Sequence, residues 1–192
     1  ILKSRFGTSG RSVIKINSKK QFFNLVSLTK KPMIQEFLGK KNKYFDEEYT
    51  CSIFTSKEGD MIGPFTSQRI LKNGTSWVLK TYNNSKLKKK VIEIAKKINN
   101  RGTINIQFKK NKNKFIPFEI NSRFSGTTSI RAAFGFNEPE FYIRNFFLNQ
   151  KLKNLKIKDG FVFRYVEEIF LNDSNIFNLK RNFSKGKKIE WL

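Results

Sequence analysis

The 192-residue sequence has no histidine, one cysteine and only 4 prolines. Without histidine, neither a Ser-His nor a Cys-His catalytic pair can form, and the commonest zinc ligand is missing. A lone cysteine, Cys51, excludes an internal disulfide framework and a cysteine-based zinc site. The side chains left for chemistry are carboxylates, amides, lysines and arginines. These are the hard oxygen ligands of Mg²⁺ and the cations that bind phosphate.

Acidic residues are also few, since 15 Asp and Glu stand against 39 Lys and Arg, which gives a formal net charge of +24. Such a charge is typical of nucleic-acid-binding proteins. The alternative is a general lysine-rich composition, because lysines recur throughout the chain and no RRM, KH or zinc signature accompanies them. We favour the compositional interpretation. A basic surface would in either case attract anionic ligands.

Long hydrophobic runs are absent as well, and none approaches the roughly 18 residues that a membrane span needs. No signal-peptide pattern is present, so we expect a cytoplasmic protein without membrane contact. Hydrophobic residues still make up 38% of the chain, enough for a core in one domain or in two small lobes. The chain opens Ile1-Leu2-Lys3 without methionine, and we interpret it as a fragment whose upstream part is missing.

Periodicity predicts an α+β fold, with a mainly antiparallel sheet and helices packed on one face. Asn73-Gly74 is a strong hairpin turn signal, and Asn17 or Ser18 can cap the first helix. Strands are predicted at 12–16, 33–38 (short and buried), 48–56, 61–71, 75–82, 103–109, 114–121 and 161–171, and helices at 17–30, 85–100, 129–134 and 138–147.

The most informative stretch is the predicted hairpin 102–121. Side chains alternate along a strand, so Glu119, Asn121 and Arg123 share one face. Gln107 on the partner strand could join them. A carboxylate flanked by amide oxygens is a reasonable Mg²⁺ site, and an arginine beside it could clamp a phosphate or carboxylate. An ordinary solvated sheet face would show the same alternation, so spacing alone leaves both interpretations open.

Two further stretches suggest ligand contacts. The Gly-rich segment after Lys3 could cradle phosphates with its backbone amides, although it is not a Walker A loop. The apolar strand that ends at Leu38 could offer backbone groups to adenine, with a carboxylate such as Glu48 for ribose hydroxyls. A plain turn and a plain core strand are the corresponding alternatives.

The three stretches in this order resemble the ATP-grasp superfamily, in the manner of the carbamoyl-phosphate synthase large subunit and its short relatives. The resemblance runs from Lys3 to about Phe147 and is most specific at Asn105-x-Gln107 and 118–126, although Ser122 stands where the family usually has proline. It implies ATP and Mg²⁺ (or Mn²⁺) as cofactors. The implied metal ligands are Gln107, Glu119 and Asn121; the implied nucleotide-binding residues are Lys3, Gly7, Ser9, Gly10, Glu36, Phe37, Leu38, Glu48, Gln107 and Glu119, with Glu47 competing with Glu48.

The resemblance also implies a reaction, the ligation of a carboxylate to an amine or thiol through an acylphosphate. Arg123 would lie near the transferred phosphoryl group, and Arg131 is our preferred cation for the substrate carboxylate. The implied partners are ATP, a small carboxylate and the missing N-terminal part of the same protein; a homodimer is compatible, and nucleic acid is not favoured. A degenerate, non-catalytic ATP-grasp domain and a basic nucleic-acid-binding module are the alternatives.

The same resemblance suggests how the chain is divided. An ATP-grasp domain is expected over residues 1–150, with a small lobe over about 1–37 and a large lobe over about 38–150. Residues 151–192 would then supply a C-terminal strand and a covering segment. The domain is expected to lack its N-terminal part.

Overall fold

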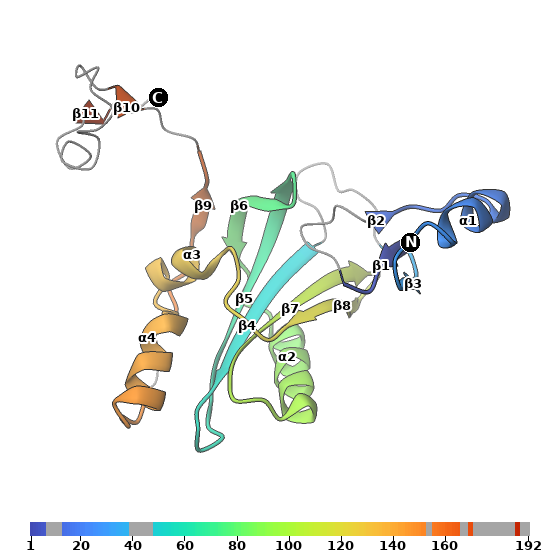
Figure 1. Cartoon of the computed structure of the whole chain (residues 1–192). Coiled ribbons are helices and arrows are strands. Elements are labelled where there is room, and N and C mark those ends of the chain that lie inside the picture. The colour runs from blue at the N-terminus through green and yellow to red at the C-terminus, as the bar shows by residue number, and fades with distance from the viewer. Residues whose placement is uncertain (7–12, 39–47, 153–154, 166–168, 171–186, 189–192) are drawn as a thin grey trace, which may run out of the picture.

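The computed structural model describes residues 1–6, 13–38, 48–152, 155–165, 169–170 and 187–188. Its centre is a six-stranded sheet in the order β8-β7-β4-β5-β6-β9, in which each neighbouring pair is antiparallel. Figure 1 shows this sheet in the middle of the molecule, with helix α1 and a small sheet at one end and helices α3 and α4 at the other. The six strands are β4 (Glu48–Thr55), β5 (Met61–Lys72), β6 (Thr75–Thr81), β7 (Gly102–Asn111), β8 (Lys114–Asn121) and β9 (Phe161–Phe163).

The small sheet has three antiparallel strands in the order β2-β1-β3, where β1 is Leu2–Ser4, β2 is Val13–Ile14 and β3 is Pro32–Ile34. The expected buried strand over 33–38 is wrong in both extent and burial. The regular strand ends at Ile34, whose side chain is 69% exposed, and only Leu38 in that range is buried. Apolar residues predicted a strand correctly here, but apolar content does not by itself determine which strand is covered.

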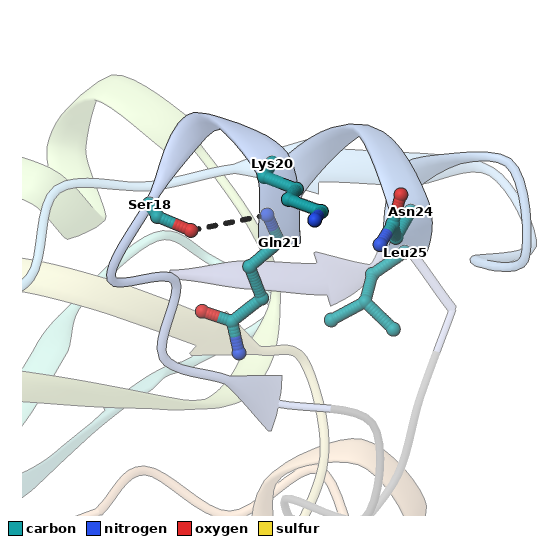
Figure 2. A pocket seen from close by; sticks show the side chains of 5 residues that line it. All are labelled: Ser18, Lys20, Gln21, Asn24 and Leu25. Atoms are coloured by element: carbon teal, nitrogen blue, oxygen red, sulfur yellow. Dashed lines mark hydrogen bonds between the residues drawn. The ribbon is translucent and has the colours of Figure 1, made fainter.

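Helix α1 (Lys19–Val26) follows β2 and begins as the sequence predicts. The Ser18 hydroxyl accepts the backbone N–H of Gln21 at 3.1 Å, the N-cap contact drawn in Figure 2. No residue of α1 is buried, although Leu25 lines a shallow hollow beside the cap. The helix therefore depends on its cap and local contacts more than on a core.

Helix α2 (Ser85–Ile98) covers one face of the large sheet. Asn84 caps its first turn, and Asn99 ends it in a left-handed conformation with φ of 51°. Leu87, Val91 and Ala95 recur every fourth residue and are fully buried. They pack on alternate residues of the central strands, among them Cys51, Ile53, Ile104, Ile106 and Phe108.

The opposite face is covered at one end by α3 (Thr128–Ala133), α4 (Glu138–Tyr142) and the π-helical turn Ile143–Phe147 that continues α4. Phe54, Phe65 and Leu79 of the sheet pack there against Ile130 and Phe136. The α+β class and the antiparallel sheets are confirmed. The helices differ from the expected arrangement, because they pack on both faces and not on one.

The residues at the β5–β6 turn have the backbone conformation that a tight hairpin turn requires. Asn73 and Gly74 have φ of 51° and 76°, the two positive values that a tight hairpin turn needs. The β7–β8 connection is tighter than the predicted four-residue turn, since the strands extend to Asn111 and Lys114. Two short strands, Ile169–Phe170 (β10) and Lys187–Lys188 (β11), pair with each other near the C-terminus.

Candidate functional site

One face of the central strands carries polar side chains at every second position. The strand register brings Gln107 opposite both Thr50 and Glu119, and Asn105 opposite both Ser52 and Asn121. Because a strand alternates its side chains, these residues share the face opposite α2. We call this set the polar face, and it consists of Glu48, Thr50, Ser52, Arg69, Thr103, Asn105, Gln107, Glu119 and Asn121.

The three residues predicted to bind metal converge on a single carboxylate. Gln107 Nε2 donates to Glu119 Oε1 at 3.1 Å, and Asn121 Nδ2 donates to the same oxygen at 2.7 Å. Side-chain contacts at these distances place one carboxylate and two amide groups within reach of one bound ion. This donor set suits a hard cation such as Mg²⁺, provided that phosphate oxygens and water supply the remaining ligands.

Glu48 lies next to this cluster and is 7% exposed. Two basic side chains neutralise it: Arg69 Nη2 is 2.6 Å from Oε1, and Lys109 Nζ is 3.3 Å from Oε2. The same Arg69 Nη2 also donates to Gln107 Oε1 at 2.7 Å. A continuous chain of polar contacts therefore joins the predicted ribose carboxylate to the predicted metal ligands.

The predicted adenine hinge lies beside the same hairpin. Gln35 Nε2 donates to the backbone oxygen of Phe118 at 3.3 Å, which ties the segment after β3 to β8. Glu36 follows it, and Phe37 is 52% exposed with Lys15 Nζ 4.6 Å from its ring centroid. Leu38 is buried at 6% exposure. The segment thus approaches the Glu119 strand from the small-sheet side.

The phosphate-binding stretch is only partly described. Lys3 lies in the central strand of the small sheet, opposite Val13 on one side and Met33 on the other. The predicted phosphate contacts Gly7, Ser9 and Gly10 lie outside the described residues, as does Glu47. The roles assigned to these residues remain predictions.

The two arginines predicted to be catalytic lie in different surroundings. Arg123 is exposed, follows the end of β8 and donates from Nη1 to the backbone oxygen of Phe124 at 2.9 Å. Arg131 of α3 has no exposed surface at all. Its Nη1 lies 3.2 Å from Glu138 Oε2, so its charge is already paired inside the protein. A contact between Arg131 and substrate remains a prediction, and this burial argues against it.

The Arg131–Glu138 pair lies under the buried end of the polar face. Arg131 Nη2 donates to Asn105 Oδ1 at 2.5 Å and to Thr50 Oγ1 at 3.1 Å. The Ser52 hydroxyl donates to Glu138, and Thr103 Oγ1 donates to Glu138 Oε1 at 3.0 Å. These contacts attach the α3–α4 segment to β4 and to β7, the strand that carries Gln107.

Burial shifts the pKa values of two groups in this region. Desolvation lowers the pKa of Arg131 from its ordinary value, and the charge and hydrogen bonds of Glu138 oppose that shift. On the α2 side of the sheet, desolvation raises the pKa of the Cys51 thiol to about 12, although the nearby Arg131 charge lowers it. Cys51 is therefore a protonated core residue at neutral pH and not a nucleophile.

Several residues in and around the polar face were not predicted as ligands of metal or nucleotide. Lys109 and Glu138 were missed, Asn105 was quoted only as part of the Asn105-x-Gln107 motif, and Arg69 was a substrate-side candidate less favoured than Arg131. A signal was present for Lys109 and Asn105, because Thr103, Asn105, Gln107 and Lys109 are polar at alternate positions of one strand. Glu138 carries no such signal, since it meets the strands through a helix that is distant in sequence.

The comparisons with known proteins identify the family and the fold. A family model described as ATP-grasp in the biosynthetic pathway with Ter operon matches residues 43–169, more than half of the chain. The class of protein is therefore the ATP-grasp proteins. Within that class, the chain belongs to the family of ATP-grasp proteins of the biosynthetic pathway with the Ter operon. The predicted ATP-grasp resemblance is confirmed.

Solved structures show the same fold. N5-carboxyaminoimidazole synthetase from Staphylococcus aureus, complexed with ADP, has a TM-score of 0.67 at 17% identity, over 96% of this chain and 49% of that one. The biotin carboxylase domain dimer of 2-oxoglutarate carboxylase from Hydrogenobacter thermophilus, in complex with MgADP, ADP and bicarbonate, has a TM-score of 0.65 at 14% identity, over 83% and 39%. The chain thus spans about half the length of the first of these structures.

The remaining comparisons add little. No curated protein matches the chain. Within the described part of the chain, no helix is both long and apolar enough to cross a membrane.

Proposed function

We propose that the chain supplies the nucleotide- and metal-binding part of an ATP- and Mg²⁺-dependent ligase that joins a carboxylate to an amine or a thiol through an acylphosphate. The observation that carries this proposal is the convergence of Gln107 and Asn121 on the Glu119 carboxylate. Family membership supports it, since the same fold holds ADP in the Staphylococcus aureus structure and MgADP in the Hydrogenobacter thermophilus structure.

Four residues of the polar face, together with Lys3, have a role in this proposal. Glu119 and Asn121 would hold the cation with their side-chain oxygens, and Gln107 would add a third oxygen. Glu48 accepts hydrogen bonds from the ribose hydroxyls, and Lys3 neutralises phosphate charge from the small sheet. When bound, Mg²⁺ neutralises charge on the β- and γ-phosphate oxygens.

The reaction then follows from positioning and charge. A carboxylate oxygen of the substrate attacks the γ-phosphorus, the bond to the bridging oxygen breaks, and ADP leaves with the electron pair. Arg123 lies at the exposed end of β8, where its guanidinium can stabilise charge on the transferred phosphoryl group. An amine or thiol then displaces phosphate from the acylphosphate. No histidine or nucleophilic cysteine is required, which fits the composition of the chain.

Isothermal titration of ADP into the chain, with and without Mg²⁺, tests the proposal. We expect binding that strengthens with Mg²⁺ in the wild type, and a loss of that Mg²⁺ effect in Glu119→Gln and Asn121→Ala. Glu93→Gln is the matched control, because Glu93 is an exposed helix carboxylate paired with Lys90. Equal ADP binding by wild type and Glu119→Gln, with no Mg²⁺ effect in either, would contradict the proposal.

The alternative of a basic nucleic-acid-binding module predicts a different result. It requires tight oligonucleotide binding that weakens steeply with salt and that competes with ADP. The ligase proposal predicts that ADP with Mg²⁺ binds equally well in the presence of an oligonucleotide.

A further inference from the structure

Gln107 lies between a group that can only donate hydrogen bonds and a group that can only accept them. Arg69 donates to its Oε1 at 2.7 Å, and Glu119 Oε1 accepts from its Nε2 at 3.1 Å. A guanidinium has no acceptor, and an ionised carboxylate has no donor. Only one orientation of the Gln107 amide satisfies both neighbours, so its oxygen faces Arg69 and its nitrogen faces Glu119.

A metal ion at Glu119 would need the opposite orientation. Cations bind the oxygen of an amide and not its nitrogen, yet the nitrogen of Gln107 points to the carboxylate that would hold the ion. To become a ligand, Gln107 must turn its amide and give up the hydrogen bond from Arg69. That bond comes from a charged donor, and such bonds are stronger than neutral ones.

Arg69 is itself held firmly in place. Its side chain is 10% exposed, and both Nε and Nη2 donate to Glu48 Oε1, at 3.1 and 2.6 Å. Lys109 Nζ binds the other oxygen of Glu48 at 3.3 Å. Because Arg69 cannot readily swing away, its hydrogen bond to Gln107 is a standing feature of the site and not an incidental surface contact.

We propose that Arg69 is a positioning residue that competes with the metal ion for the Gln107 amide oxygen. This inference rests on the proposed function and deepens it. The competition weakens the binding of a bare divalent cation. The penalty is smaller for a cation that arrives with nucleotide phosphates, because those phosphates supply most of its oxygen ligands and the Gln107 oxygen then contributes less to binding. The site therefore favours the metal–nucleotide complex over the free ion.

A double-mutant cycle on the full chain tests the proposal, with Mn²⁺ alone as the probe and free Mn²⁺ measured by electron paramagnetic resonance. Arg69→Met should tighten Mn²⁺ binding about tenfold, the order expected for losing one charge-assisted hydrogen bond. In a Gln107→Leu background, where no amide oxygen is left to compete for, Arg69→Met should change the Mn²⁺ affinity only through the lost charge. The effects of Arg69→Met in the two backgrounds should therefore differ by about tenfold. Lys72→Met removes an equal charge from the same strand and controls for net charge.

Two further variants keep the test decisive. Arg69→Met combined with Glu48→Gln removes both partners of the buried pair, preserves net charge and should show the same tightening. If Arg69 has only a structural role, Mn²⁺ should bind more weakly to both variants, and this result overturns the proposal. The proposal is also overturned if Arg69→Met changes the Mn²⁺ affinity equally with and without Gln107. If either of these results is found while the wild type still binds Mn²⁺ together with ADP, the role of Arg69 is refuted and the proposed function stands. If no variant binds Mn²⁺ with or without ADP, the proposed function fails with it.

Discussion

The Arg131–Glu138 pair provides the sharpest stability prediction. Both side chains have 0% exposure, and the carboxylate also accepts from Ser52 and Thr103. Arg131→Met would leave the Glu138 charge buried with only neutral hydroxyl donors. Removing one partner of a buried pair costs about 3–5 kcal/mol of unfolding free energy. For a protein of this size that corresponds to a fall in Tm of roughly 6–20 °C.

Urea denaturation followed by circular dichroism measures this loss. Arg131→Met combined with Glu138→Gln removes both charges, keeps an acceptor for Ser52 and Thr103, and should recover at least half of the lost stability. Arg144→Met is the control, because its pair with Glu140 is exposed and such pairs contribute about 0.3–0.5 kcal/mol. A loss below about 1 kcal/mol in Arg131→Met, or no recovery in the double variant, would refute the reasoning.

Two other predictions concern the core. Gly63→Ala should destabilise the fold by more than about 1 kcal/mol in thermal unfolding, since its φ is 99° and an added Cβ would lie 2.8 Å from the Phe136 ring. Gly126→Ala, where nothing lies within 4 Å of an added Cβ, should leave stability unchanged, and equal effects of the two changes would contradict the packing. Burial raises the pKa of the Cys51 thiol to about 12, so a disulfide reagent at pH 8 should label it only after unfolding. The pKa of Cys51 is higher in the folded state than in the unfolded state, so the protonated thiol contributes its full stability below pH 9. From pH 9 toward pH 12 the free energy of unfolding should fall by about 1.4 kcal/mol per pH unit. An equal loss of stability at alkaline pH in Cys51→Ala would disprove this assignment.

Local sequence signals predicted the part of the site that one hairpin builds. The alternation in 114–121 and the turn residues before it place Glu119 and Asn121 on one face, and the hairpin register adds Gln107 from the adjacent strand. These three residues are neighbours because of side-chain alternation and hairpin register, which depend only on residues close together in the sequence. The structure accordingly brings them together as the sequence analysis expected.

The contacts made by Arg69 could not be predicted in the same way. Arg69 reaches Gln107 across β4, because β4 pairs with both β5 and β7. That strand order depends on packing between residues far apart in the chain and leaves no local pattern. Arg131 shows the same limit, since it was the preferred cation for the substrate carboxylate, whereas its partner Glu138 comes from the next helix.

The central claim is a metal site at Glu119 and Asn121, and paramagnetic broadening tests it most directly. Substoichiometric Mn²⁺ added with ADP to the ¹⁵N-labelled chain should broaden the backbone amide signals of Gln107, Glu119 and Asn121 first. The signals of α1, including Lys20 and Asn24 in Figure 2, should remain sharp. Broadening centred on any other part of the molecule, or a pattern that Glu119→Gln leaves unchanged, would contradict the account.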